Sequence, residues 1–167
     1  GIVHHVGHGF RNTMSVGSGT LDNSDIDNLA NGNRQSVVYA INCSSTAIDF
    51  NAIGERFLKN PNGGGVAYIG SSRVASGGPF RQLQNKFYEL VFEDSVTSVG
   101  QALALSKVPF LGEATSETPT RWLEFAVLLL GDPELPIWRR GPEEIFVNHS
   151  STYLLGAGSY SVVVNVA

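Results

Sequence analysis

The sequence has a single cysteine, few basic residues and no long apolar run, and each shortage excludes a class of protein. One cysteine, Cys43, in 167 residues cannot form a disulfide within the chain. Eleven Lys and Arg residues and a net charge of -4 leave no clustered basic face of the kind that neutralises nucleic-acid phosphates. The longest apolar stretch, residues 125–130, is far shorter than the roughly 20 residues that span a bilayer. We therefore expect no nucleic-acid partner and no membrane span.

The length suits one domain of ordinary size, with a core that needs no cross-links. Residues 2–6 read as a short strand with no loop and no partner strand before it. We therefore expect a piece of a longer protein that lacks the first strands of its domain.

Apolar runs alternate with amphipathic segments at spacings typical of βαβ units and a mainly parallel sheet flanked by helices. We expect strands at residues 2–6, 36–41 and 66–70, with a polar loop over 11–22. The segment 36–41 is apolar almost throughout, as in a strand covered on both faces. Helical spacing predicts helices at 23–30, 47–58, 80–92, 95–105 and 120–130.

The pattern changes after residue 130. Residues 131–136 have turn chemistry, and residues 159–166 alternate with period two, as a half-buried strand does. We expect an α/β domain over residues 1–140 and the first strands of a small β module over 141–167. Two strands are too few for a stable sandwich, so we expect this module to be incomplete.

Three reactive or polar groups follow three predicted strands. His8 follows the first strand, Cys43 the second, and Ser71, Ser72 and Arg73 the third. Ligands of open α/β sheets bind beyond the carboxyl ends of the strands, so these groups should converge on one edge. Cys43 could then be a nucleophile, with the backbone N–H groups of Gly9 and Cys43 as oxyanion donors. The alternative is that Cys43 is a buried small hydrophobe.

Four motifs, in this order, resemble the catalytic domain of the gingipain-type cysteine peptidases, which have a caspase-like fold. They are His8-Gly9, the strand ending in Asn42-Cys43, NPNGGGVAYIGSS at 60–72 and LGDP at 130–133. The resemblance extends to about residue 138, and the segment after 143 resembles the start of the immunoglobulin-like module that often follows such domains.

This resemblance implies a cysteine endopeptidase with a polypeptide substrate and a secreted or cell-surface location. It makes His8 the catalytic histidine and Cys43 the nucleophile, which forms a thioester. It also puts Ser71, Ser72 and Arg73 in part of the substrate pocket. Arg73 would pair there with an acidic substrate side chain, or else be a solvated loop arginine.

Other interpretations stay open. A thioester can also be resolved by an amine, which would make the protein a sortase-like transpeptidase. The domain could instead be an inactive structural or assembly module of a surface protein. Zinc binding by His4, His5 and His8 is disfavoured, because consecutive strand residues face opposite ways, so no metal site and no cofactor is expected. Asp132 either caps a turn or binds a structural calcium ion.

Overall fold

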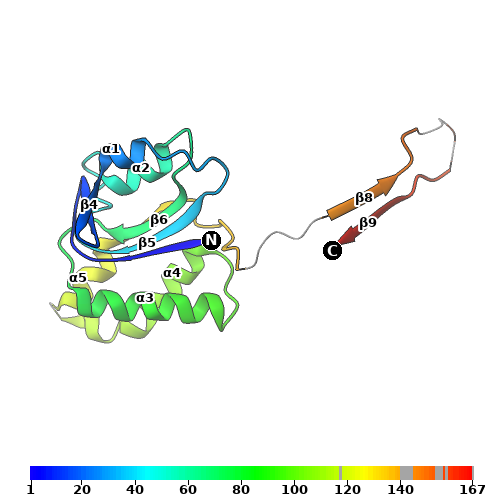
Figure 1. Ribbon diagram of the computed structural model, residues 1–167. Coiled ribbons are helices and arrows are strands. Elements are labelled where there is room, and N and C mark those ends of the chain that lie inside the picture. Colours follow the sequence, from blue (N-terminus) through cyan, green and yellow to red (C-terminus); the bar gives the residue numbers. More distant parts are fainter. Residues whose placement is uncertain (117, 140–144, 153–155, 157, 167) are drawn as a thin grey trace.

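The computed structural model describes residues 1–116, 118–139, 145–152, 156 and 158–166, and a four-stranded sheet lies at its centre (Figure 1). The sheet has the order β1-β5-β6-β7, with the strands β1 (Ile2–Val6), β5 (Ser36–Ile41), β6 (Gly65–Ser71) and β7 (Val127–Gly131). β1, β5 and β6 are parallel, whereas β7 is antiparallel to β6. The expectation of a mainly parallel α/β sheet flanked by helices is confirmed.

Helices cover both faces of this sheet (Figure 1). They are α1 (Asn23–Asp27), α2 (Ile53–Lys59), α3 (Gly77–Phe92), α4 (Val99–Lys107) and α5 (Pro119–Ala126), with two short 3₁₀ turns at Val108–Phe110 and Glu113–Thr115. α1 and α2 lie on one face, and α3, α4 and α5 lie on the other. Because β1, β5 and β6 are parallel, their carboxyl ends lie at the same edge of the sheet, between the two helical layers.

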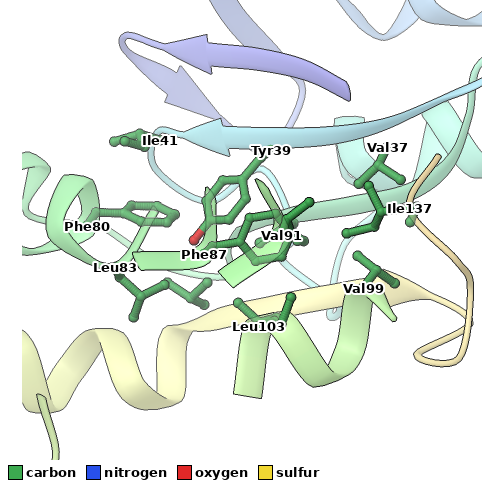
Figure 2. Close-up of a cluster of buried hydrophobic side chains, with 14 of the residues drawn as sticks. Val37, Tyr39, Ile41, Phe80, Leu83, Phe87, Val91, Val99, Leu103 and Ile137 are labelled. Atoms are coloured by element: carbon green, nitrogen blue, oxygen red, sulfur yellow. The ribbon is translucent and has the colours of Figure 1, made fainter. Parts of the chain in front are cut away.

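The apolar composition of β5 follows from burial on both faces. Val37, Tyr39 and Ile41 belong to the core under α3, α4 and α5, and Figure 2 shows their side chains among those of that helical layer. Val38 and Ala40 point to the opposite face and join the core formed with α1 and α2. Tyr39 is fully buried, with its ring 5.0 Å from the ring of Phe87 in α3. A strand between two cores needs apolar residues at every position.

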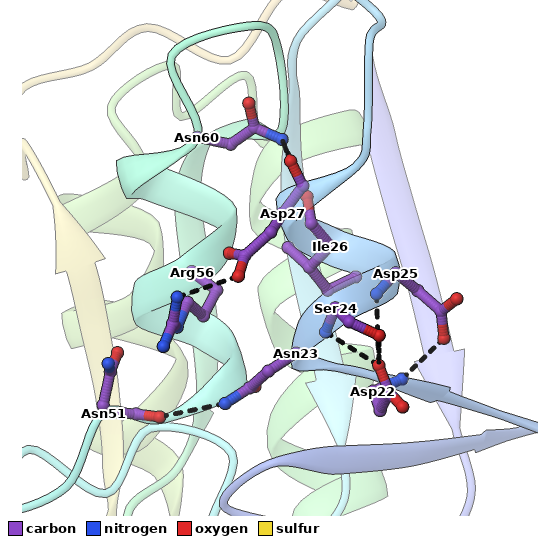
Figure 3. Close-up of polar contacts among 9 residues, drawn as sticks. All are labelled: Asp22, Asn23, Ser24, Asp25, Ile26, Asp27, Asn51, Arg56 and Asn60. Atoms are coloured by element: carbon purple, nitrogen blue, oxygen red, sulfur yellow. Dashed lines mark hydrogen bonds and ion pairs between the residues drawn. The ribbon is translucent and has the colours of Figure 1, made fainter.

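Polar contacts fix α1 against α2 (Figure 3). Asp22 caps α1 by accepting hydrogen bonds from the backbone N–H groups of Ser24 and Asp25. Arg56 of α2 pairs with Asp27 at 2.8 Å, and the Asn60 amide donates to the carbonyl of Ile26 at 2.7 Å. The carbonyls that end α1 are thus satisfied by the loop that ends α2.

Several sequence expectations are wrong in detail, and the helix expected at 95–105, for example, is observed at Val99–Lys107. The expected loop at 11–22 contains most of a small antiparallel sheet of the strands β2 (Gly9–Phe10), β3 (Thr13–Val16) and β4 (Gly19–Asp22). Its Met14 side chain is buried against the core next to α1, which stabilises these short strands. The helix expected at 47–58 begins only at Ile53. The helix expected at 120–130 ends at Ala126, because the residues that follow pair with β6.

Two strands, β8 (Ile145–His149) and β9 (Val162–Val166), form an antiparallel hairpin after the α/β domain. Figure 1 shows this hairpin away from the central sheet. Its assignment to an immunoglobulin-like module stays a prediction, and so does the boundary at residue 140, which lies outside the described residues. None of the described helices has the length and apolar character needed to cross a membrane.

Candidate functional site

His8 and Cys43 follow the ends of neighbouring parallel strands. Val6, the last residue of β1, is paired in register with Ile41, the last residue of β5. The N–H of Gly7 continues this alignment by donating to the carbonyl of Ile41 at 3.1 Å. His8 and Cys43 each lie two residues beyond the paired strand ends, so both belong to the same edge of the sheet.

The backbone of His8 is fixed by β3. The N–H of His8 donates to the Ser15 hydroxyl at 2.9 Å, and that hydroxyl donates back to the carbonyl of His8 at 3.1 Å. The N–H of Ser15 donates to the same carbonyl at 2.9 Å. The side chain of His8 is exposed, so its imidazole is accessible from solvent.

Gly9 brings the histidine segment against the cysteine segment. A Cβ atom at Gly9 would lie 2.8 Å from Cβ, Cγ and Nδ2 of Asn42, which directly precedes Cys43. Asn42 is 3% exposed and has little room to move aside. Glycine at position 9 therefore permits the close approach of His8-Gly9 to Asn42-Cys43.

The Cys43 thiol faces the loop that follows β6. Its Sγ accepts a hydrogen bond from the N–H of Ala75 at 3.4 Å, and the Cys43 side chain is half-buried. The chain turns sharply at Ser44, which has a φ of 55°, and the N–H of Ser44 donates to the carbonyl of Arg73 at 3.0 Å. The same Sγ lies 3.9 Å from the carbonyl oxygen of Ala75, so both backbone groups of Ala75 contact the thiol.

The side chain of His5 links β3 to the segment of Cys43. Its Nε2 lies 2.7 Å from the carbonyl oxygen of Ser15, and its Nδ1 lies 3.4 Å from the amide nitrogen of Asn42. A carbonyl oxygen only accepts, so Nε2 carries the proton and Nδ1 accepts from Asn42. The sequence analysis considered His5 only as a zinc ligand, which it disfavoured, and did not find this bridge.

A pocket of about 670 Å³ opens beside Ala75, the residue that contacts the thiol. Its lining comes from the loop after β6 and from the start of α5, and comprises Val74, Ala75, Ser76, Thr118, Pro119, Arg121, Trp122 and Phe125. The indole N–H of Trp122 donates to the carbonyl of Val74 at 2.7 Å, which joins the two walls. None of the described residues that line it carries a carboxylate. Its size is typical of a ligand pocket.

The three residues expected in a substrate pocket lie next to the thiol segment but differ in exposure. Ser71 is fully buried and donates to the carbonyl of Arg73 at 2.9 Å, and Ser72 is 9% exposed. The Arg73 guanidinium forms an ion pair with Asp49 at 2.9 Å. Ser72 and Arg73 line a second, smaller pocket, on the side of Ser44. The role of all three in substrate binding stays a prediction.

The remaining candidates have structural partners. The His4 ring packs at 5.8 Å against the ring of Tyr88, and Asp132 accepts from the N–H of Glu134 at 2.9 Å, which is a turn contact. No group of three His, Cys, Asp or Glu side chains in the described part of the chain could hold a metal ion.

The sequence analysis missed the contribution of α5 to the pocket. Trp122 and Phe125 are 51% and 73% exposed, although both lie in a segment that was expected to pack as one helix. The signal that could have found them is the spacing of two large aromatic residues three positions apart, which places them on the same side of a helix.

Comparisons with known proteins give one family match and several similar structures. The family model of peptidase family C25 matches residues 1–138. The structure is similar to the Arg-specific cysteine proteinase gingipain R, with a TM-score of 0.75 and 18% identity over 98% of this chain and 39% of that one. It is also similar to the gingipain R complex of pro- and mature domains from Porphyromonas gingivalis (TM-score 0.74, 16% identity, 98% and 40% covered).

A third structure, described as a protease, gives a TM-score of 0.70 at 17% identity over 98% of this chain and 41% of that one. The chain thus spans about two fifths of the length of the structures it matches. A search among curated proteins gave no match.

Proposed function

The chain belongs to peptidase family C25, and from this premise we propose that it carries the catalytic pair of a cysteine endopeptidase, with Cys43 as nucleophile and His8 as acid and base. The observation that supports this most is the contact of Gly9 with Asn42, which brings the segments of both residues together at one edge of the sheet. The hydrogen bond from the N–H of Ala75 to the Cys43 sulfur also supports the proposal.

In the proposed reaction, His8 accepts the proton of the Cys43 thiol as the sulfur attacks the carbonyl carbon of the scissile peptide bond. The backbone N–H groups of Gly9 and Cys43 stabilise the oxyanion, and His8 protonates the departing amine as the C–N bond breaks. The acyl group then forms a thioester with Cys43. His8 next removes a proton from water, which attacks the thioester and releases the acid.

The pocket beside Ala75 is suited to a substrate side chain near the scissile bond. The side chains of Val74, Trp122 and Phe125 give it an apolar wall, while Arg121 contributes a positive charge. The substrate in this proposal is a polypeptide. The proposal also includes a secreted or cell-surface location and an immunoglobulin-like module that begins with β8 and β9.

Labelling and cleavage by the intact protein test the proposal. We expect Cys43→Ala to abolish labelling by a thiol-reactive peptide probe and cleavage of a peptide library. His8→Ala should slow cleavage by about 10²–10⁴-fold, which is the usual contribution of acid-base catalysis. His4→Ala is the matched control, since the His4 ring packs on Tyr88 and lines neither of the two pockets near Cys43.

Labelling of the Cys43→Ala protein, or full cleavage by the His8→Ala protein, would contradict the assignment. Addition of an amine nucleophile distinguishes the two fates of the thioester. Hydrolysis gives only free acids, whereas a transpeptidase gives the amide of the added amine.

A further inference from the structure

A second pocket lies on the other side of the Cys43 segment. It has a volume of about 200 Å³, enough for the end of a side chain rather than for a whole ligand. Its walls come from residues that directly follow Gly9 and Cys43 in the sequence and from two neighbouring loops, namely Phe10, Arg11, Ser44, Asp49, Phe50 and Arg73. A peptide bound at the proposed catalytic pair would therefore pass close to it.

Arg11 is held in this pocket between two aromatic rings. Its guanidinium carbon lies 4.0 Å from the centre of the Phe50 ring and 4.9 Å from that of the Phe10 ring. Its carbonyl accepts a hydrogen bond from the N–H of Ile53 at 2.6 Å, which fixes the backbone to the start of α2. Both rings make cation–π contacts with the guanidinium, and none of its N–H groups donates to an acceptor among the described residues, so these donors are available.

No carboxylate in the described part of the chain pairs with Arg11. The nearby Asp49 is already engaged, because its two oxygens contact the two terminal nitrogens of Arg73 at 2.9 and 3.3 Å. The Arg73–Asp49 pair is neutral as a unit, so Arg11 gives the pocket a positive charge. A preorganised, unpaired guanidinium is well suited to bind a carboxylate with two parallel hydrogen bonds.

We infer that the Arg11 pocket binds a carboxylate of the peptide substrate and so makes acidic sequence next to the scissile bond a determinant of specificity. This inference rests on the proposed function. The carboxylate comes either from an Asp or Glu side chain or from the C-terminus of a short peptide, since both present the same pair of oxygens. Arg73, which the sequence analysis considered for this role, is occupied by Asp49.

Peptide cleavage by the intact protein tests the inference. Asp or Glu is compared with Asn or Gln at each of the three positions on either side of the scissile bond, and a C-terminal carboxylate is compared with an amide. We expect an acid at one of these positions to raise kcat/KM at least about tenfold, since a single charge-assisted hydrogen bond already gives about that factor. The Arg11→Gln protein should lose this preference, and Arg11→Glu should prefer Lys at the same position.

Arg81→Gln is the matched control, because Arg81 is an exposed arginine of α3 outside both pockets. It should keep the full preference for acidic peptides. Equal kcat/KM for acidic and amide peptides in the unmodified protein would overturn the inference and leave the peptidase assignment intact.

Binding to the Cys43→Ala protein separates the site from the chemistry. Fluorescence anisotropy of the preferred acidic peptide and of its amide counterpart should show tighter binding of the acid, and Arg11→Gln should abolish the difference. This result without any cleavage by the unmodified protein would retain the carboxylate site and reject the peptidase. Equal affinity of the two peptides would overturn the site.

Discussion

The replacement of Gly9 by alanine is the sharpest test of the contact between the two proposed catalytic segments. The added Cβ would lie 2.8 Å from three atoms of Asn42, whereas non-bonded carbon atoms rest at about 3.5–4.0 Å. Asn42 or Gly9 must therefore move by about 1 Å. Since Asn42 is buried, the displacement is expected to pass along the backbone to Cys43.

A shift of this size has separate effects on rate and on stability. A misplacement of about 1 Å between reacting groups can lower the rate about 10²-fold. Overpacking of a filled site costs about 1–3 kcal/mol of unfolding free energy, so the Gly9→Ala protein should still fold. We expect kcat/KM for peptide cleavage to fall about 10²-fold while thermal unfolding remains cooperative at a somewhat lower Tm.

Gly19→Ala provides the control within the same small sheet. Its Cβ would meet only the carbonyl oxygen of Val16, at 3.6 Å, which is an ordinary contact. Substitution at Gly19 should leave kcat/KM within about twofold of the unmodified value, the variation expected of a surface change. If Gly9→Ala and Gly19→Ala had the same kcat/KM, the contact between Gly9 and Asn42 would have no role in catalysis.

Two further substitutions test the surroundings of the site. His5→Phe removes the bridge between Ser15 and Asn42, so we expect kcat to fall about tenfold with KM unchanged. His5→Gln keeps a donor and an acceptor and should therefore retain most of the kcat of the unmodified protein. An unchanged kcat in His5→Phe would reject the bridge. Burial raises the pKa of Glu124, and Lys107 opposes this shift. Because the pKa of Glu124 is raised in the folded state, its contribution to stability is lost as the pH rises through that pKa. The Tm of the Glu124→Gln protein, relative to the Tm of the unmodified protein, should therefore increase from pH 4 to pH 7. A relative loss over this range would show that attraction to Lys107 outweighs burial.

The centre of the fold is predictable because its residues allow one environment only. Every position from Val37 to Ile41 is apolar, and a strand of that composition must be covered on both faces. The strand then ends at the polar pair Asn42-Cys43, and the strand Ile2–Val6 ends just before His8-Gly9. Two strand ends followed by reactive residues were enough to predict a common edge.

The pocket walls are less predictable, because tertiary pairing decides their structure. Residues 125–130 form an apolar run that periodicity alone cannot assign to a buried helix or a buried strand. The free edge of β6 is what makes Val127–Gly131 a strand, and α5 ends at Ala126 as a result. Trp122 then lies beside Val74, near the thiol, rather than in a long helix on the sheet.

The sequence analysis also missed the small sheet of β2, β3 and β4, although this sheet makes several contacts with the candidate site. β3 is four residues long and half polar, so its sequence alone reads as a loop. Yet Ser15 of this strand holds the backbone of His8 and also accepts from His5.

The pairing of β1 with β5 sets the geometry of the proposed catalytic pair. His8 and Cys43 each lie two residues beyond the paired residues Val6 and Ile41, so both segments leave the sheet at the same point along the strand direction. A shift of one residue would turn every β1 side chain to the opposite face and would move Gly9 away from Asn42. The hydrogen bond from Gly7 to Ile41 extends the register past the strand ends, up to the residue before His8. The register is thus fixed by backbone hydrogen bonds, while the His8 side chain is exposed and the Cys43 side chain is half-buried.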